Sequence, residues 1–106
     1  MQNTQERIQS EIKAEKIVIF MKGTPDSPQC GFSARAVEIL QGLGRPFHSV
    51  DILANPDIRA TLPQISNWPT FPQIFVKGKL IGGCDILNEM HERGELKPLV
   101  EEAFKN

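Results

Sequence analysis

Short apolar runs and amphipathic segments alternate along the 106 residues of the chain. Residues 17–21 (IVIFM) are apolar throughout and mostly β-branched, which predicts a strand covered on both faces. Residues 47–52 alternate between apolar and polar side chains, as a strand does when one face is covered. Residues 74–76 and 80–81 flank Lys77-Gly78-Lys79, where the glycine supplies a turn, so we expect a hairpin there. The pattern therefore predicts four strands.

Helical periodicity fills the intervals between these strands. The predicted helices cover about residues 4–15, 31–43, 55–65, 85–93 and 96–104. Asn3 followed by Glu6 resembles a capping box for the first helix, and Pro63 is expected to end or distort the third. A helix between two strands implies a parallel pair, and the hairpin adds antiparallel strands. We therefore expect an α/β protein with a thioredoxin-like fold: a four-stranded mixed sheet flanked by helices, in one domain over residues 1–106.

Composition and charge narrow the class of function. The chain has 12 basic and 13 acidic side chains, a net charge of −1 and no Lys/Arg cluster, so it lacks the electrostatic signature of nucleic-acid or anionic-membrane binding. The polar N-terminus has no apolar signal-peptide core, and the longest apolar run, five residues, is far too short to span a membrane. Two sparse cysteines then predict free thiols in a reducing, cytoplasmic environment.

Cys30 is the first candidate for chemistry. It follows a turn-rich stretch, residues 22–29, and stands just ahead of a predicted helix. The unpaired N–H groups of that helix and the nearby Lys22 would lower the pKa of the Cys30 thiol and favour its thiolate. The alternative is an inert structural cysteine, but the turn around Cys30 is not a core pattern. Ser33 stands where a dithiol redox site would have its second cysteine.

Two further segments are candidates for a binding site. Residues 68–73 (WPTFPQ) contain two X-Pro bonds, and a cis bond at one of them would present the preceding backbone to an extended peptide. The alternative is a rigid loop with a packed tryptophan. Residues 82–85 (GGCD) combine glycines with a helix start, and suit a ligand carrying a carboxylate and an amino group. The alternative there is a plain turn with Asp85 as N-cap. Neither His48 nor His91 has metal-ligand spacing to a cysteine.

Four segments in order resemble the monothiol, CGFS-type glutaredoxins: KGTP at 22–25, CGFS at 30–33, WPTFP at 68–72 and GGCD at 82–85. The resemblance extends from about residue 4 to residue 104 and is to the single-domain bacterial form. It implies a thioredoxin-like fold and glutathione as the ligand.

By this resemblance Cys30 is the reactive, catalytic thiol. The glutathione-binding residues that it implies are Lys22, Arg59, Phe71, Pro72, Gly83, Cys84 and Asp85. Lys22, assisted by Arg59, would meet the glycine carboxylate of glutathione. The backbone before a cis Pro72 would face its cysteinyl part, and residues 84–85 would hold its γ-glutamyl end. Glutathione has two carboxylates and an ammonium group, and this set supplies two cations, helix amides and one carboxylate.

The same resemblance implies a use for a lone thiolate. An iron–sulfur cluster takes four thiolates, and one chain offers a single well-placed one, Cys30. Two chains and two glutathiones would supply four, so a 2Fe–2S cluster would bridge a homodimer with Cys30 as the protein ligand. The family implies cluster assembly, storage and transfer to apo iron–sulfur proteins, and cluster-bridged heterodimers with BolA-like partners.

The alternative function is a glutathione-dependent thiol–disulfide oxidoreductase that removes glutathione from proteins by a monothiol mechanism. Ser33 does not forbid it, but loop 23–29 is expected to change how glutathione lies over Cys30, which favours a cluster carrier over an efficient enzyme. A Cys30–Cys84 disulfide under oxidation would require Cα atoms within about 7 Å. A third alternative is an interaction module that keeps the fold without redox activity.

Overall fold

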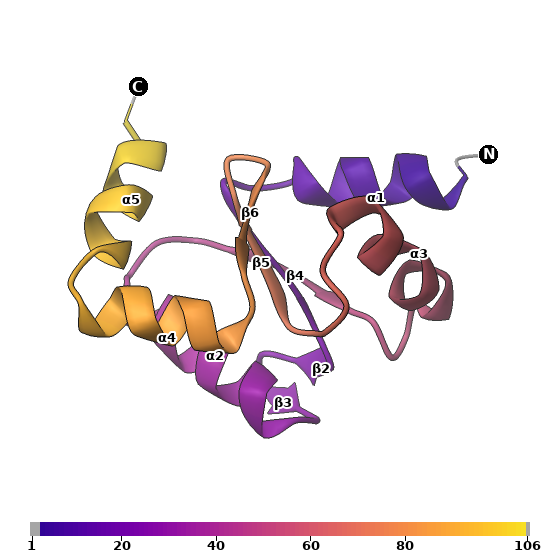
Figure 1. The fold of residues 1–106 in the computed structure, drawn as a ribbon, viewed down its shortest axis with the longest axis horizontal. Coiled ribbons are helices and arrows are strands. Elements are labelled where there is room, and N and C mark those ends of the chain that lie inside the picture. Colours follow the sequence, from indigo (N-terminus) through magenta and orange to yellow (C-terminus); the bar gives the residue numbers. More distant parts are fainter. Residues whose placement is uncertain (1–2, 106) are drawn as a thin grey trace.

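The computed structural model describes residues 3–105 and places a four-stranded sheet between two groups of helices (Figure 1). The strands are β1 (Ile17–Met21), β4 (His48–Asp51), β5 (Gln73–Val76) and β6 (Lys79–Gly82). Their order across the sheet is β4-β1-β5-β6. β1 runs parallel to β4 and antiparallel to β5, and β6 runs antiparallel to β5. The carboxyl ends of β1, β4 and β6 therefore share one edge, where β5 begins.

In the described part of the chain, residues 3–105, five helices cover both faces of the sheet (Figure 1). α1 (Thr4–Ile12) and α3 (Pro56–Ser66) lie on one face. α2 (Gly31–Gly42), α4 (Cys84–Glu92) and α5 (Leu96–Ala103) lie on the other. The mixed sheet between two helical layers confirms the predicted α/β, thioredoxin-like architecture. Within residues 3–105, no helix has the length and apolar character needed to cross a membrane.

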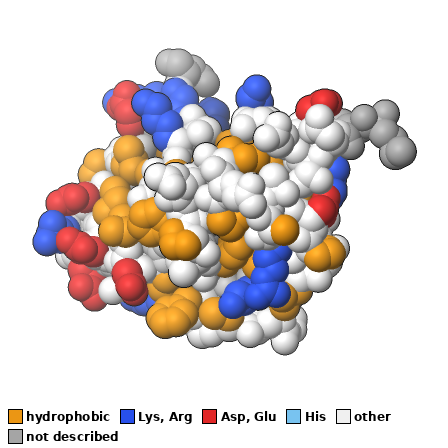
Figure 2. Space-filling view, turned by 45° about the vertical axis from the view of Figure 1, so that its right-hand side comes forward, with side chains coloured by type: hydrophobic (Ala, Val, Ile, Leu, Met, Phe, Trp, Pro, Cys, Tyr) orange, Lys and Arg blue, Asp and Glu red, His pale blue; other side chains and the backbone are white. Residues whose placement is uncertain are grey.

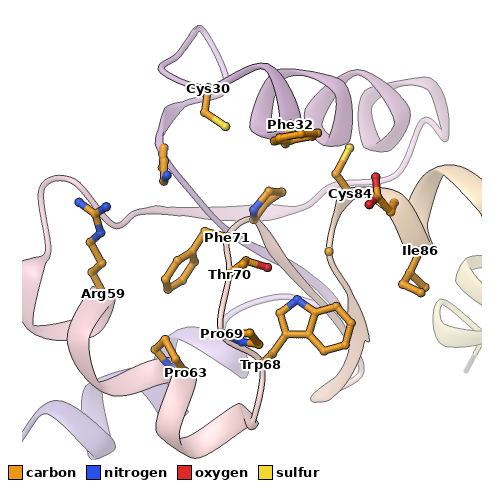
Figure 3. A pocket seen from close by; sticks show the side chains of 14 residues that line it. Cys30, Phe32, Arg59, Pro63, Trp68, Pro69, Thr70, Phe71, Cys84 and Ile86 are labelled. Atoms are coloured by element: carbon orange, nitrogen blue, oxygen red, sulfur yellow. The ribbon is translucent and has the colours of Figure 1, made fainter.

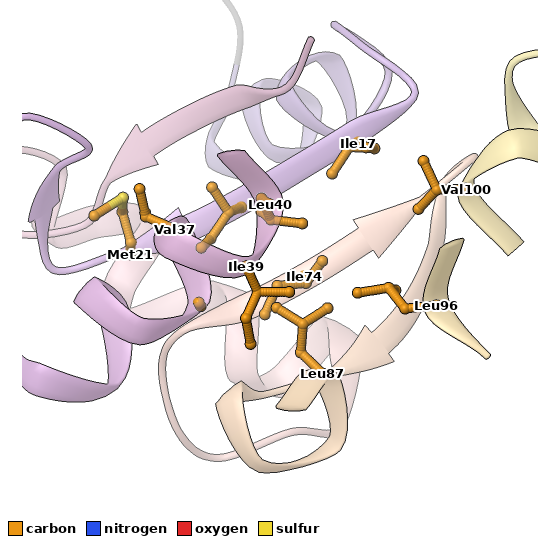
Figure 4. Close-up of a cluster of buried hydrophobic side chains, with 11 residues drawn as sticks. Ile17, Met21, Val37, Ile39, Leu40, Ile74, Leu87, Leu96 and Val100 are labelled. Atoms are coloured by element: carbon orange, nitrogen blue, oxygen red, sulfur yellow. The ribbon is translucent and has the colours of Figure 1, made fainter. Parts of the chain in front are cut away.

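The core has two parts because every residue of β1 is buried. Ile17, Ile19 and Met21 point to the cluster under α2, α4 and α5 (Figure 4). Val18 and Phe20 point to the cluster under α1 and α3. Successive side chains of a strand face opposite sides of the sheet, so an uninterrupted apolar run supplies both clusters. The prediction of a strand covered on both faces is confirmed.

The first helix is shorter than predicted. The Asn3 side chain accepts a hydrogen bond from the Glu6 N–H at 2.8 Å, which confirms the N-terminal cap. The helix ends at Ile12, not at residue 15, and Lys13 is its C-cap. Ile8 and Ile12 are its buried residues, and no apolar side chain that packs on the sheet follows before β1. Without a buried face, the next turn lacks the packing that stabilises short helices.

Pro63 does not end the third helix, which continues to Ser66. A proline inside a helix lacks the N–H that would bond four residues back, a loss of about 3 kcal/mol in an isolated helix. Here Ile58 and Leu62 are buried against the sheet and hold the helix in place. Tertiary packing thus outweighs the local preference of Pro63.

The segment expected to be only a turn, residues 22–29, contains a two-stranded ladder. β2 (Gly23–Thr24) pairs antiparallel with β3 (Ser27–Pro28). A ladder of two residues on each side is too short to leave a period-2 pattern in the sequence. The Gly23 N–H also donates to Asp51 Oδ1 at 2.9 Å, which ties the ladder to the carboxyl end of β4.

Candidate functional site

A pocket of about 560 Å³ opens at the edge of the sheet where β1, β4 and β6 end (Figure 3). The structure brings together all of the residues that the sequence proposed for binding and catalysis. The predicted residues that line the pocket are Lys22, Cys30, Arg59, Phe71, Pro72, Gly83, Cys84 and Asp85. These residues come from five separate segments of the chain, so their convergence follows from the fold.

Six further residues line the same pocket. They are Phe32, Pro63, Trp68, Pro69, Thr70 and Ile86. Residues 68–70 lie in a segment that the sequence marked as a candidate without assigning these side chains a contact. Phe32 lies inside the CGFS motif and Ile86 directly follows the GGCD motif, but neither was assigned to the site, because the sequence does not show that their apolar side chains are exposed.

Cys30 is the N-cap of α2 and is half-buried, with extended backbone angles (φ −157°, ψ 138°). The pKa of its thiol is lowered, mainly because the Ser33 N–H points at the sulfur. The Phe32 N–H, the charge of Lys22 and the Ser33 hydroxyl lower this pKa further, against the opposing effect of burial. Unpaired N–H groups at a helix start favour a negative charge. The predicted shift toward the thiolate is therefore confirmed in direction.

Lys22 connects β1 to β2, and three hydrogen bonds fix the backbone around it. Its N–H donates to Ser33 Oγ at 3.1 Å, and its carbonyl accepts from the Gln29 N–H at 2.9 Å. The next amide, Gly23 N–H, donates to Asp51 Oδ1 at 2.9 Å. The Lys22 side chain is half-buried and faces the pocket. The loop that carries the Lys22 side chain is therefore held by hydrogen bonds to both α2 and β4.

The loop from Trp68 to Pro72 is fastened by Gln73, the first residue of β5. Gln73 has no exposed surface, and its Nε2 donates to the carbonyl of Trp68 at 2.9 Å and to that of Thr70 at 3.3 Å. The Phe71–Pro72 peptide bond is cis, as the resemblance implied. Among the described residues, Trp68 Nε1 and Gln73 Oε1 are buried without a hydrogen-bond partner. The loop backbone is thus positioned by one buried amide side chain.

The third segment places the start of α4 against this loop. Gly83 is the N-cap of α4, so the alternative in which Asp85 caps the helix is wrong; Asp85 lies exposed in the first turn. Cys84 is buried, and burial raises the pKa of its thiol, as does the charge of Asp85. A Cβ at Gly83 would lie 3.2 Å from the Pro72 carbonyl oxygen, so a side chain there requires the loop to shift by a few tenths of an ångström.

Charge is distributed unevenly along the pocket. Arg59 on α3 lies at one end, whereas Cys84 and Ile86 on α4 lie at the other (Figure 3). Lys22 is a second cation in the lining, and the α4 end has helix N–H groups and the Asp85 carboxylate. An extended ligand with an anion at one end and both signs of charge at the other would match this arrangement.

The rim of the pocket is apolar. Phe32 is 62% exposed and Ile86 is 37% exposed, and both line the pocket. Figure 2 shows a face of the molecule on which hydrophobic side chains gather beside basic ones. The polar groups of the pocket therefore lie next to exposed apolar side chains, which can be buried against another molecule at little cost in free energy.

Neither histidine lines the pocket. His48 on β4 contacts the Glu11 carboxylate, and His91 is exposed on α4. Within residues 3–105, no group of three or more His, Cys, Asp or Glu side chains is arranged to hold a metal ion. Both cysteines are free thiols.

Comparison with known proteins gives consistent matches. The protein family described as Glutaredoxin matches residues 17–81. The chain is 56% identical over 103 residues to "Glutaredoxin 4" of Escherichia coli K12, covering 97% of this chain and 90% of that protein. It is 62% identical over 86 residues to "Probable monothiol glutaredoxin GrlA" of Legionella pneumophila, covering 81% of this chain and 97% of that one.

Solved structures agree in fold. Reduced apo GrxS14 from poplar has 47% sequence identity and a TM-score of 0.82, covering 93% of this chain and 91% of its own. A buckwheat glutaredoxin solved as a glutathione complex has 28% identity and a TM-score of 0.83, covering 94% of this chain and 89% of its own.

Proposed function

The chain belongs to the glutaredoxin family, and from that premise we propose that it binds glutathione and carries 2Fe–2S clusters. It is a monothiol member, because Ser33 replaces the second cysteine of a dithiol site. In this proposal residues 1–106 act as one glutaredoxin domain in the cytoplasm, a reducing environment that suits two free thiols.

Glutathione would lie along the pocket with its sulfur at Cys30. Lys22 and Arg59 would bind its glycine carboxylate, and the Phe71 backbone ahead of Pro72 would bind its cysteinyl part. The Gly83–Asp85 segment would bind the γ-glutamyl end through helix N–H groups and the Asp85 carboxylate. The uneven charge of the pocket supports this orientation. The buckwheat glutaredoxin solved with glutathione has the same fold, which supports the choice of ligand.

The observation that carries the cluster proposal is the contrast between the two thiols. Cys30 is half-buried and its thiol pKa is lowered, whereas Cys84 is buried and its thiol pKa is raised. Thiolates, not thiols, ligate iron, so one chain supplies one ligand, Cys30. Two chains and two glutathiones complete the four thiolates of a 2Fe–2S cluster, with Cys30 contributed by each subunit of a homodimer.

The cluster is cargo in this proposal. Half of its ligands come from a small thiol that dissociates, so a receiving protein displaces glutathione with its own cysteines by ligand exchange. Apo iron–sulfur proteins are therefore the expected recipients. The apolar rim formed by Phe32 and Ile86 suits contact with a second protein, either another copy or a BolA-like partner.

Anaerobic reconstitution with iron, sulfide and glutathione tests this function. We expect the wild type to give a coloured dimer by visible absorption and size-exclusion chromatography, and Cys30→Ser to stay colourless and monomeric. S-methylglutathione is the matched ligand control, because it keeps the charges of glutathione but lacks a free thiol, and it should support no colour. Equal iron and sulfide in the wild type and Cys30→Ser would exclude Cys30 as the ligand.

The accessibility of the Cys30 thiolate also supports the second candidate, protein deglutathionylation. The thiolate would attack the glutathione sulfur of a mixed disulfide and release the protein thiolate; a second glutathione thiolate would then regenerate Cys30 and release oxidised glutathione. Turnover of a glutathionylated peptide by cluster-free protein separates the two functions. Rates at the uncatalysed background leave cluster carriage alone, whereas fast turnover by a protein that binds no cluster would favour the enzyme.

A further inference from the structure

We propose that Asp51 and Asn55 are positioning residues of this site: their hydrogen bonds connect the two segments that carry the cations of the pocket, and the connection selects a ligand with a free carboxylate. Those cations are Lys22 and Arg59. Neither Asp51 nor Asn55 lines the pocket, so both act through residues that do. The inference rests on the proposed function, in which the glycine carboxylate of glutathione binds both cations.

Asp51 holds the segment that follows β1. It is the last residue of β4 and pairs with Met21, the residue before Lys22. Its Oδ1 accepts the N–H of Gly23, the residue after Lys22, at 2.9 Å. The same oxygen accepts the Leu53 N–H at 2.9 Å, which fixes the turn between β4 and α3. One carboxylate oxygen thus binds both the Lys22 segment and the turn that leads to α3.

Asn55 is the N-cap of α3 and holds the start of that helix. Its Nδ2 donates to the Asp51 carbonyl at 2.9 Å, and its own carbonyl accepts the Arg59 N–H at 3.0 Å. Its Oδ1 accepts from Arg7 Nη2 at 2.8 Å, which adds a connection to α1. The backbone of Arg59 is therefore linked through Asn55 to Asp51, and one further hydrogen bond leads from Asp51 to the amide after Lys22.

This link matters because lysine and arginine side chains are long and flexible. Each loses rotamer freedom when it binds a carboxylate, and a mobile backbone would add to that loss. Where the two backbones are already held together, only the side chains remain to be ordered, so both cations bind one carboxylate at a lower cost in entropy. Asp51 and Asn55 supply this preorganisation from outside the pocket.

The test compares Asp51→Ala with Asp51→Asn, which lose the same charge. Asparagine keeps an Oδ1 that accepts both amides, whereas alanine keeps no acceptor, so the difference between the two variants reports the hydrogen bonds. The ligands are glutathione and its ester at the glycine carboxylate, titrated by NMR into reduced, cluster-free protein. We expect Asp51→Ala to bind glutathione roughly tenfold more weakly than Asp51→Asn does, close to the loss of one hydrogen bond to a charged group. Their affinities for the ester should agree within about twofold.

A merely structural role of Asp51 would weaken both ligands alike or would lower only the melting temperature, and either result would overturn the proposal. If Asp51→Ala does not fold, Asn55→Ser takes its place. Serine is also favoured at the N-cap of a helix, but it lacks the amide that donates to the Asp51 carbonyl. Asn55→Ser should therefore lose affinity for glutathione and not for the ester, relative to the wild type, and equal losses for the two ligands would again overturn the proposal.

A measurement without ligand separates this inference from the proposed function. In hydrogen exchange followed by NMR, Asp51→Ala should exchange faster than Asp51→Asn at the Gly23 amide, which loses its acceptor. It should also exchange faster at the Arg59 amide, whose acceptor, the Asn55 carbonyl, is unchanged. Equal exchange of the Arg59 amide in the two variants would refute the link. Equal binding of glutathione and the ester by the wild type would instead refute the proposed orientation of glutathione, and the exchange comparison would still decide the link.

Discussion

Replacing Gly83 by alanine tests how closely the start of α4 packs against the loop from Trp68 to Pro72. An added Cβ would lie 3.2 Å from the Pro72 carbonyl oxygen and 3.4 Å from Trp68 Nε1. The φ of −98° at Gly83 is open to any residue, so backbone strain adds nothing. The effect comes from space alone, and the backbone of Pro72 has to give by a few tenths of an ångström.

The expected loss of stability is about 1 kcal/mol. Adding a methylene to a well-packed site costs roughly 1–3 kcal/mol, and alanine offsets about 0.4–1 kcal/mol by restricting the unfolded chain. In a domain of this size, 1 kcal/mol corresponds to a melting temperature lower by about 4–8 °C. Because the two sides of the pocket move apart, we also expect glutathione to bind roughly tenfold more weakly, a change of about 1.4 kcal/mol.

Thermal unfolding by circular dichroism and titration calorimetry with glutathione measure the two effects. Gly42→Ala is the matched control: a Cβ there meets nothing within 4 Å, and Gly42 is the last residue of α2. We expect Gly42→Ala to keep glutathione affinity and to keep or raise the melting temperature. Wild-type stability and affinity in Gly83→Ala would show that the contact with Pro72 is not tight, and the packing argument would fail.

Two other features lead to measurements. The lowered pKa of the Cys30 thiol predicts alkylation already at neutral pH, whereas the raised pKa of Cys84 leaves it unreacted until the protein unfolds. Because the folded pKa of Cys30 is lowered, its contribution to the free energy of unfolding is present above the ordinary thiol pKa and is lost as pH falls through the folded pKa. Because the folded pKa of Cys84 is raised, its contribution is present below the ordinary thiol pKa and is lost as pH rises through the folded pKa. Separately, Arg45→Ala removes both a cation 5.1 Å from the Phe104 ring and the ion pair of Arg45 with Glu101, and should cost about 1 kcal/mol, measured by urea unfolding. The exposed ion-pair variant Arg93→Ala should cost less than half of that, and equal losses would show that the ring contact adds nothing.

The main features of the fold could be predicted from the sequence because β1, which is buried on both faces of the sheet, is a run of five consecutive apolar residues. The eight residues proposed from the four motifs and from Arg59 also lie together, since all of them line one pocket. The helix across Pro63 was not predictable from local preference, because its stability comes from Ile58 and Leu62 packed on a distant sheet. Local sequence preferences therefore predict an element correctly only where long-range packing does not outweigh them.

The residues that hold the backbone of the site in place were the hardest to predict from the sequence. Asp51 and Gln73 are ordinary polar residues in the sequence, and Ser33 is marked there only by its place in the CGFS motif, yet each hydrogen-bonds the backbone of a site segment. The partners of Asp51 and Gln73 include Gly23 and Trp68, and no sequence pattern encodes such pairs. What identifies these three residues is partner geometry together with burial, which the sequence does not supply.

The hydrogen bonds made by these residues explain how so small a sheet supports a binding site. Lys22 follows β1, Asp51 ends β4 and the start of α4 follows β6, so three strands deliver their carboxyl ends to one edge. In open α/β sheets that edge is where ligands bind. Residues that follow the end of a strand no longer take part in the hydrogen bonds of the sheet, so their backbone amides need other partners. Ser33 and Asp51 supply those partners for two consecutive amides, those of Lys22 and Gly23, so the groups that end the sheet also orient the pocket.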